Sequence, residues 1–227
     1  MTVRHAIGML LMTLSLATGT IAATPQARPL RVAFVISQNF NVIDFAGPWE
    51  VFQDVVVSGA ASGDHSAAFE LYTVAGSLEP VTSTGGARVI PAYTFGNAPK
   101  PDIVVIGAQS DNSEVLLDWL RGQYASNATI ASVCTGARKL ALSGLLDGKQ
   151  ATTHHDFIAG FRASYPKVRW LDSQRFVHSA DRLYTAGGLT SGIDLALHLV
   201  AQRYGQQTAQ ATADYMEYRG RDWQTAD

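Results

Sequence analysis

The chain has 227 residues, 47% hydrophobic and 16% charged, so it can bury a large core and is not of the disordered class. Its 17 basic and 19 acidic residues give a formal net charge of −2, which argues against the basic surface of a nucleic-acid-binding protein. Beyond the N-terminus, no apolar run approaches the roughly 20 residues that a membrane span needs.

The first 23 residues have the order of a secretory signal peptide. A short basic start, MTVRH, precedes the uncharged apolar stretch AIGMLLMTLSLATGTIA, which closes on the small residues Ala22 and Ala23. We expect cleavage near this pair, which would give a periplasmic or secreted protein with no membrane anchor. A buried first helix or an uncleaved anchor is the alternative.

Short apolar runs alternate with segments of helical periodicity along the rest of the chain. The apolar runs predict strands that are buried on both faces, at residues 30–37, 68–76, 102–108, 129–133 and 182–187. The helical segments lie between or after them, at residues 44–57, 112–126, 137–144 and 191–205. Strands alternating with helices favour a mainly parallel sheet, and no linker divides residues 30–220, so we predict one α/β domain.

Several residues mark the expected ends of these elements. Pro48 is expected in the first turn of the first helix, and Asn112 or Ser113 should cap the second. The remaining expected markers are Gly144 and Gly205 at helix ends, and Ser191 and Asp194 as caps of the last helix. Residues 81–99 predict a hairpin and a connection at the sheet edge. Residues 168–186 predict two short antiparallel strands before the last buried strand.

Residues 131–139 read ASVCTGARK and contain the only cysteine of the chain, so no disulfide can form within it. Cys134 falls at the turn from a predicted strand into a predicted helix, which is the geometry of a nucleophile elbow. The helix N-terminus should favour the thiolate, and Thr135 and Gly136 should leave backbone N–H groups for an anion. We therefore predict a reactive thiol with a lowered pKa. The alternative is a small buried apolar residue, which is how most free cysteines behave.

Three segments, in order, resemble the ThiJ/PfpI superfamily. They are VIDFAGPWEVF at 42–52, SVCTGARKLALSGLLDGKQATTHH at 132–155 and TAGGLTSGIDLALHLV at 185–200. Within the superfamily, these segments are most similar to isonitrile (isocyanide) hydratases and to the amidase-like domain of AraC-type regulators. The resemblance implies a flavodoxin-like (class I glutamine amidotransferase-like) sandwich, and also a homodimer.

The resemblance also assigns roles to individual residues. It implies that Cys134 is the nucleophile, that Asp44 is the supporting acid and base, and that Thr135 assists in the turn. The residues implied to bind substrate or an oxyanion through the backbone are Gly107, Ala108 and Gly136. Relatives commonly carry Gly-Gly where this chain has Gly107-Ala108, followed by Gln109, which could add a polar contact to the pocket.

Other candidates have a structural and a functional interpretation. Glu50 is expected to complement the helix dipole, with a dimer contact as the next possibility. His154 and His155 follow two threonines and offer a Cys–His pair, but the family's Cys–Asp mechanism favours the structural interpretation. The six histidines show no HExxH or paired-cysteine spacing, so we expect no metal site, and no cofactor.

The resemblance favours a cysteine-dependent hydratase that adds water to a small electrophile, as in the conversion of an isocyanide to an N-substituted formamide. One alternative is a redox or glyoxalase-like protein, although such relatives usually carry Glu where this chain has Asp44. The other is a small-ligand-binding module. A regulator would need a helix-turn-helix region, and only about twenty residues follow Gly205. We expect a small-molecule substrate and no nucleic-acid partner.

Overall fold

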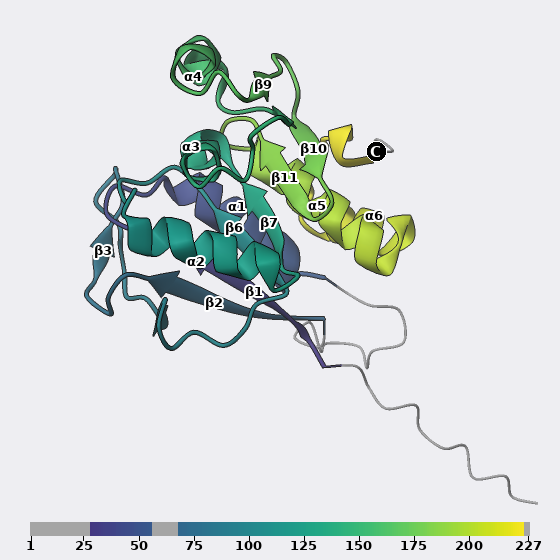
Figure 1. Cartoon of the computed structure of the whole chain (residues 1–227). Helices are drawn as coiled ribbons and strands as arrows, with labels where there is room; N and C mark the ends of the chain where they lie inside the picture. Colours follow the sequence, from purple (N-terminus) through teal and green to yellow (C-terminus); the bar gives the residue numbers. More distant parts are fainter. Residues whose placement is uncertain (1–27, 56–67, 225–227) are drawn as a thin grey trace, which may run out of the picture.

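The computed structural model describes residues 28–55 and 68–224, and it contains a seven-stranded sheet between two layers of helices (Figure 1). The strand order is β10-β11-β7-β6-β1-β2-β5, and every neighbouring pair is parallel except β10–β11. These strands are β1 (Leu30–Val35), β2 (Phe69–Ala75), β5 (Tyr93–Thr94), β6 (Ile103–Ile106), β7 (Thr129–Ser132), β10 (Phe176–Ala180) and β11 (Leu183–Ala186). The predicted flavodoxin-like α/β fold with a mainly parallel sheet is confirmed.

Helices cover both faces of this sheet. The helices are α1 (Val42–Gln53), α2 (Glu114–Ala125), α3 (Ala137–Leu142), α4 (Ile158–Ser164), α5 (Ser191–Tyr204) and α6 (Gln206–Tyr215). Helices α2 and α3 lie on the face toward the viewer in Figure 1, while α1 and α5 pack against each other on the opposite face. The 3-10 turns of the described residues are η2 (Cys134–Gly136), η3 (His155–Phe157) and η4 (Asp222–Gln224). Within the described residues, no helix has the length and apolar character to cross a membrane.

Strand β1 shows why the sheet needs a layer on each side. Side chains alternate between the two faces of a strand, and those of Val32 and Phe34 join the core beneath α1 and α5. The intervening Ala33 and Val35 join the second core, beneath α2 and α3. Since all four residues are buried, the continuous apolar run is satisfied only by two covered faces.

The ends of the helices confirm some expectations and correct others. Ser113 caps α2 through Leu116 N–H, and Gly205 ends α5 with a φ of 87°, both as predicted. Helix α1 begins earlier than expected, because the side chain of Asn41 caps it at Ile43 N–H. Pro48 therefore lies inside the helix, and its expected place in the first turn is wrong.

The predicted caps of α5 are also wrong. Its N-cap is Thr190, which makes no side-chain cap hydrogen bond, and Ser191 is already the first helical residue. Asp194 is buried and accepts hydrogen bonds from Arg175 and from the hydroxyl of Tyr218. The carboxylate thus ties the segment after α6 to the strand-connecting loop at Arg175.

Short strands outside the main sheet complete the fold. They are β3 (Val81–Thr82), β4 (Arg88–Val89), β8 (Gln150–Ala151) and β9 (Arg169–Trp170). The hairpin predicted in residues 81–99 is confirmed, since β3 and β4 are antiparallel and β5 follows at the sheet edge. The predicted antiparallel pair in residues 168–186 is half right. Strand β10 is antiparallel to β11, but β9 pairs in parallel with β8.

The predicted signal peptide, residues 1–23, lies outside the described residues. Export and cleavage near Ala23 therefore stay predictions, as do the domain limits of 30 and 220.

Candidate active site

Cys134 occupies a strained turn at the carboxyl end of β7. Its φ is +56°, a conformation that non-glycine residues rarely adopt and that persists only where the surroundings enforce it. The backbone N–H of Cys134 donates to Gly187 O at 2.8 Å, and its carbonyl accepts from Thr153 Oγ1 at 2.9 Å. Two neighbouring segments thus hold the turn from both sides, as at a nucleophile elbow.

Gly136 makes this turn sterically possible. A Cβ atom at Gly136 would lie 2.1 Å from Ile106 O, at the end of the adjacent strand β6. The N–H of Gly136 donates to Val133 O at 2.9 Å, so it is engaged within the turn. The glycine therefore provides close packing of η2 against β6, and its implied role in binding an anion stays a prediction.

Asp44 reaches the cysteine from the first turn of α1 and is fully buried. Its Oδ2 accepts a hydrogen bond from Ala108 N–H at 3.0 Å, and the thiol of Cys134 faces the same carboxylate. Gly107 leaves the space for this approach, because a Cβ there would lie 2.6 Å from Asp44 Cβ. The structure thus brings together Cys134 and Asp44, the nucleophile and the acid that the resemblance implied. The N–H of Ala108, which was expected to bind substrate or an oxyanion, donates to Asp44 instead.

Burial controls the ionisation of both groups. It raises the pKa of Asp44 to about 6, although hydrogen bonds from Ala108, Cys134 and Leu189 N–H act in the opposite direction. Within the described residues, Asp44 Oδ1 is buried and has no hydrogen-bond partner of normal geometry. A carboxyl group with a pKa in this range can both accept and release a proton near neutral pH.

The expected lowered pKa of Cys134 is wrong. Burial, and after it the charge of Asp44, raise the pKa of this thiol to about 11, against the backbone N–H groups of Thr135 and Leu189. Only 5% of Cys134 is exposed, and α3 has six residues, too short for its dipole to outweigh a neighbouring carboxylate. Near neutral pH the pair therefore holds a thiol beside a carboxylate.

Alkylation kinetics test this ionisation state. We expect iodoacetamide to modify native Cys134 slowly at about pH 7.5, because little thiolate is present there. Asp44→Asn removes the negative charge that raises the pKa of the thiol, so the alkylation rate at this pH should increase. The measurement is the rate against pH for both proteins. A variant that reacts no faster than the native chain would contradict the coupling.

Lys139 is a site residue that sequence reasoning missed. It is 2% exposed, and its Nζ donates to Gln109 O at 2.6 Å, behind the loop that carries Ala108. Burial lowers the pKa of Lys139 to about 8, the charge of Arg138 acts in the same direction, and the charge of Asp111 opposes the shift. Lysine is almost always exposed in proteins, so nothing in the sequence indicates that Lys139 is buried. Gln109 is itself buried, and its Nε2 donates to Val35 O rather than pointing into a pocket.

A pocket of about 330 Å³ lies beside the elbow. Its walls come from three stretches of the chain, at residues 152–158, 173–175 and 187–191. The last of these separates the pocket from the cysteine, because Gly187 O and Leu189 N–H both contact Cys134. A substrate in this pocket would lie one loop away from the thiol.

His154 and Glu50 do not join the Cys–Asp pair. His154 lines the pocket, where its ring packs so closely on Gly188 that a Cβ there would lie 2.3 Å from His154 Cδ2. None of the hydrogen bonds among the described residues links His154 to Cys134. Glu50 is exposed and accepts from Gln53 Nε2 at 3.2 Å. It lies in the C-terminal half of α1, so its expected role of complementing the helix dipole is wrong.

The sequence is similar to a protein family, to an enzyme and to a transcriptional regulator. Residues 30–202 match the DJ-1/PfpI family. The chain is 32% identical to isonitrile hydratase of Pseudomonas putida over 197 residues, covering 83% of this chain and 78% of that protein. It is 26% identical to the HTH-type transcriptional regulator GbdR of Pseudomonas aeruginosa, covering 86% of this chain and about half (52%) of the regulator.

Solved structures agree with the fold. A THiJ/PfpI family protein from Pseudomonas syringae superimposes with a TM-score of 0.70 at 26% identity, covering 90% of this chain and 83% of that one. DJ-1beta of Drosophila melanogaster gives a TM-score of 0.69 at 17% identity, covering 85% of this chain and all of that one, and so supports the fold alone.

Proposed function

The chain belongs to the DJ-1/PfpI family, and on that premise we propose that it is a cysteine-dependent hydratase that converts a small isocyanide to an N-substituted formamide. The observation that carries this proposal is the buried contact of Asp44 with Cys134. It places a carboxyl group with a pKa of about 6 beside a nucleophile that needs a proton acceptor.

The first step forms a covalent intermediate. The isocyanide carbon is electrophilic, and Cys134 Sγ adds to it while Asp44 removes the thiol proton. Asp44 then delivers that proton to the same carbon, which gives a thioformimidate with a new C–S and a new C–H bond. The raised pKa of the thiol fits this order, because Asp44 need only accept the proton as the sulfur attacks.

The second step releases the product. Water adds to the thioformimidate carbon, and Asp44 removes one proton from it. The nitrogen is protonated and the C–S bond breaks, which gives the formamide and returns the thiol of Cys134. The sum is one isocyanide and one water consumed for one formamide formed, so no oxidant is required, and the only group that leaves is the Cys134 sulfur, which recovers its proton.

A binding role without turnover is the second candidate. The chain is similar over most of its length to transcriptional regulators as well as to an enzyme. The low exposure of Cys134 also suits a pocket that recognises a ligand without reacting with it. A binding protein would retain the pocket at residues 187–191 and show no covalent chemistry at the thiol. The redox or glyoxalase-like alternative gains no support from the Asp44–Cys134 pair, since such relatives usually carry Glu.

Formamide production distinguishes these functions. We expect purified protein incubated with a simple alkyl isocyanide to form the N-substituted formamide, measured by chromatography and mass spectrometry. Cys134→Ser should form none above the rate without protein, because a hydroxyl is a far weaker nucleophile than a thiol beside the same base. Equal formamide from both proteins, or none from the native chain, would contradict the proposal.

We also infer a homodimer and an exported protein. The family resemblance supports the dimer, and the order of residues 1–23 supports export. An enzyme of this kind would act on a small molecule and needs no nucleic-acid partner.

A further inference from the structure

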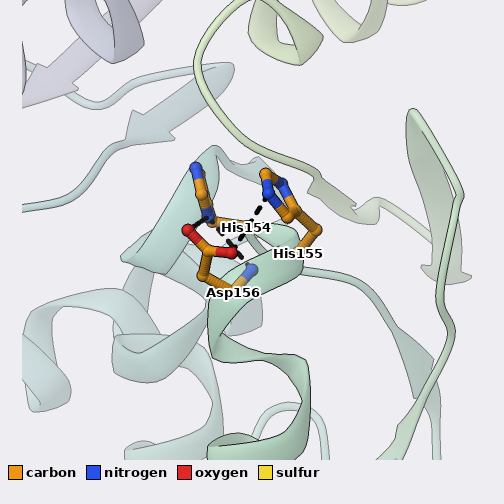
Figure 2. A group of neighbouring side chains, drawn as sticks. All are labelled: His154, His155 and Asp156. Carbon is orange, nitrogen blue, oxygen red and sulfur yellow. Dashed lines mark hydrogen bonds and ion pairs between the residues drawn. The ribbon is translucent and has the colours of Figure 1, made fainter.

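Two imidazole rings and a carboxylate gather at one rim of the pocket. They belong to the consecutive residues His154, His155 and Asp156, and Figure 2 shows the carboxylate beside the edges of both rings. His155 Nε2 is 3.1 Å from Asp156 Oδ1, and His154 Nδ1 is 3.8 Å from Asp156 Oδ2. One ligand atom from each residue lies within 4.8 Å of the other two.

His154 is the fixed member of the group. Only 18% of its side chain is exposed, and the close contact with Gly188 holds the ring in place. Its Nδ1 accepts a long hydrogen bond of 3.3 Å from Asp156 N–H, so this nitrogen carries a lone pair directed at the cluster. A metal ion at Nδ1 would replace one weak hydrogen bond.

The other two ligands can adjust to an ion. The side chains of His155 and Asp156 are 82% and 70% exposed, and the rings of His154 and His155 are stacked with centroids 4.4 Å apart. In tetrahedral coordination, bonds of about 2.0–2.2 Å to zinc place the donor atoms roughly 3.3–3.6 Å apart. The observed separations of 3.1 and 3.8 Å lie on either side of this range, so a small movement of the two exposed side chains would complete the coordination.

We propose that His154, His155 and Asp156 bind a divalent transition-metal ion of the Zn²⁺, Ni²⁺ or Cu²⁺ class at the rim of the pocket. Two imidazole nitrogens and one carboxylate are a donor set that these ions prefer over Mg²⁺ or Ca²⁺. Three protein ligands leave at least one coordination position for water or a ligand. Because His154 and His155 also line the pocket, that position is next to the space where a small molecule would bind.

The absence of spaced motifs such as HExxH predicts no metal site. Three adjacent residues have no such spacing. They converge here because the chain turns at His154 into η3, which brings the carboxylate of Asp156 close to one nitrogen of each ring. The site is separate from the Cys–Asp pair, so it does not depend on the proposed hydratase activity.

Isothermal titration calorimetry, with zinc titrated into the untagged full-length chain, tests the proposal. We expect about one ion per chain with micromolar affinity, and at least a roughly ten-fold weaker binding in His155→Ala and in Asp156→Asn. Both residues are exposed, so the melting temperature of the apo variants should stay near that of the native chain.

His178→Ala is the matched control, since His178 is an exposed histidine of β10 that does not line the pocket. The control should bind zinc as the native chain does. Absence of zinc binding, or binding that His155→Ala and Asp156→Asn leave unchanged, would overturn the proposal. Loss of binding in the control to the same extent would also overturn it, because the site would then lie elsewhere.

Discussion

Asp44→Asn is expected to lower kcat for isocyanide hydration by roughly 10²–10⁴-fold, the range for loss of a positioned general acid and base. Asparagine can still accept the hydrogen bond from Ala108 N–H, so the loop after β6 should keep its position. It can neither accept the thiol proton of Cys134 nor deliver it to carbon. Steady-state kinetics on a simple alkyl isocyanide measure the effect.

The same substitution should stabilise the fold at neutral pH. The pKa of Asp44 is higher in the native state than in the unfolded chain, so the native state binds more protons between about pH 4 and 6 and loses stability as the pH rises through that window. At about pH 7.5 the buried carboxylate costs at most about 3 kcal/mol, at 1.36 kcal/mol per pKa unit, and Asn removes this cost. The gain should vanish below about pH 4, where the carboxyl is protonated in both states.

Glu50→Gln is the matched control for both measurements. Glu50 is an exposed carboxylate on the same helix, six residues from Asp44, so its replacement should change neither kcat nor the pH dependence of unfolding appreciably. Chemical denaturation at several pH values gives the stability differences. Activity that depends on Glu50 rather than Asp44 would show that the wrong carboxylate has been assigned.

Gly136→Ala is expected to destabilise the protein by about 3 kcal/mol or more, at the upper end of the cost of overpacking. The added Cβ would lie 2.1 Å from Ile106 O, a backbone atom of a central strand that cannot move away easily. Relief requires either β6 or the η2 turn to shift, and each shift displaces Cys134 from Asp44. Turnover should therefore fall even in the fraction that remains folded.

Gly122→Ala provides the comparison. Gly122 lies inside α2, and a Cβ there meets nothing within 4 Å, so the substitution should stabilise the helix by roughly 0.5–1 kcal/mol. Denaturation midpoints of the two variants give the difference. A Gly136→Ala protein as stable and active as the native chain would contradict the close packing described for the elbow.

The position of the candidate site was predictable because it depends on local chain geometry. A β-branched run that meets Cys-Thr-Gly before a helix places Cys134 at the carboxyl edge of the sheet. Parallel strands bring the end of β6 and the start of α1 to the same edge. The position of Asp44 followed from a matching family motif rather than from spacing.

The ionisation of the site was not predictable in the same way. The pKa of Cys134 depends on how deeply α1 and residues 187–189 bury the thiol, and that depth is a property of tertiary packing. Lys139 was missed for a related reason, since nothing in the sequence tells a buried lysine from an exposed one. Helix α6 was missed because its buried residues are small, among them Ala209 and Thr212, and they carry no strong apolar period.

Mass spectrometry of the reacting protein tests the central claim most directly. Wild-type protein is mixed with an alkyl isocyanide, quenched rapidly in acid and digested. We predict a peptide containing Cys134 that is heavier by the full mass of the isocyanide, because no leaving group departs when the thioformimidate forms. The adduct should be absent from Cys134→Ser. Formamide that accumulates with no adduct at Cys134, or an adduct confined to another residue, would contradict it.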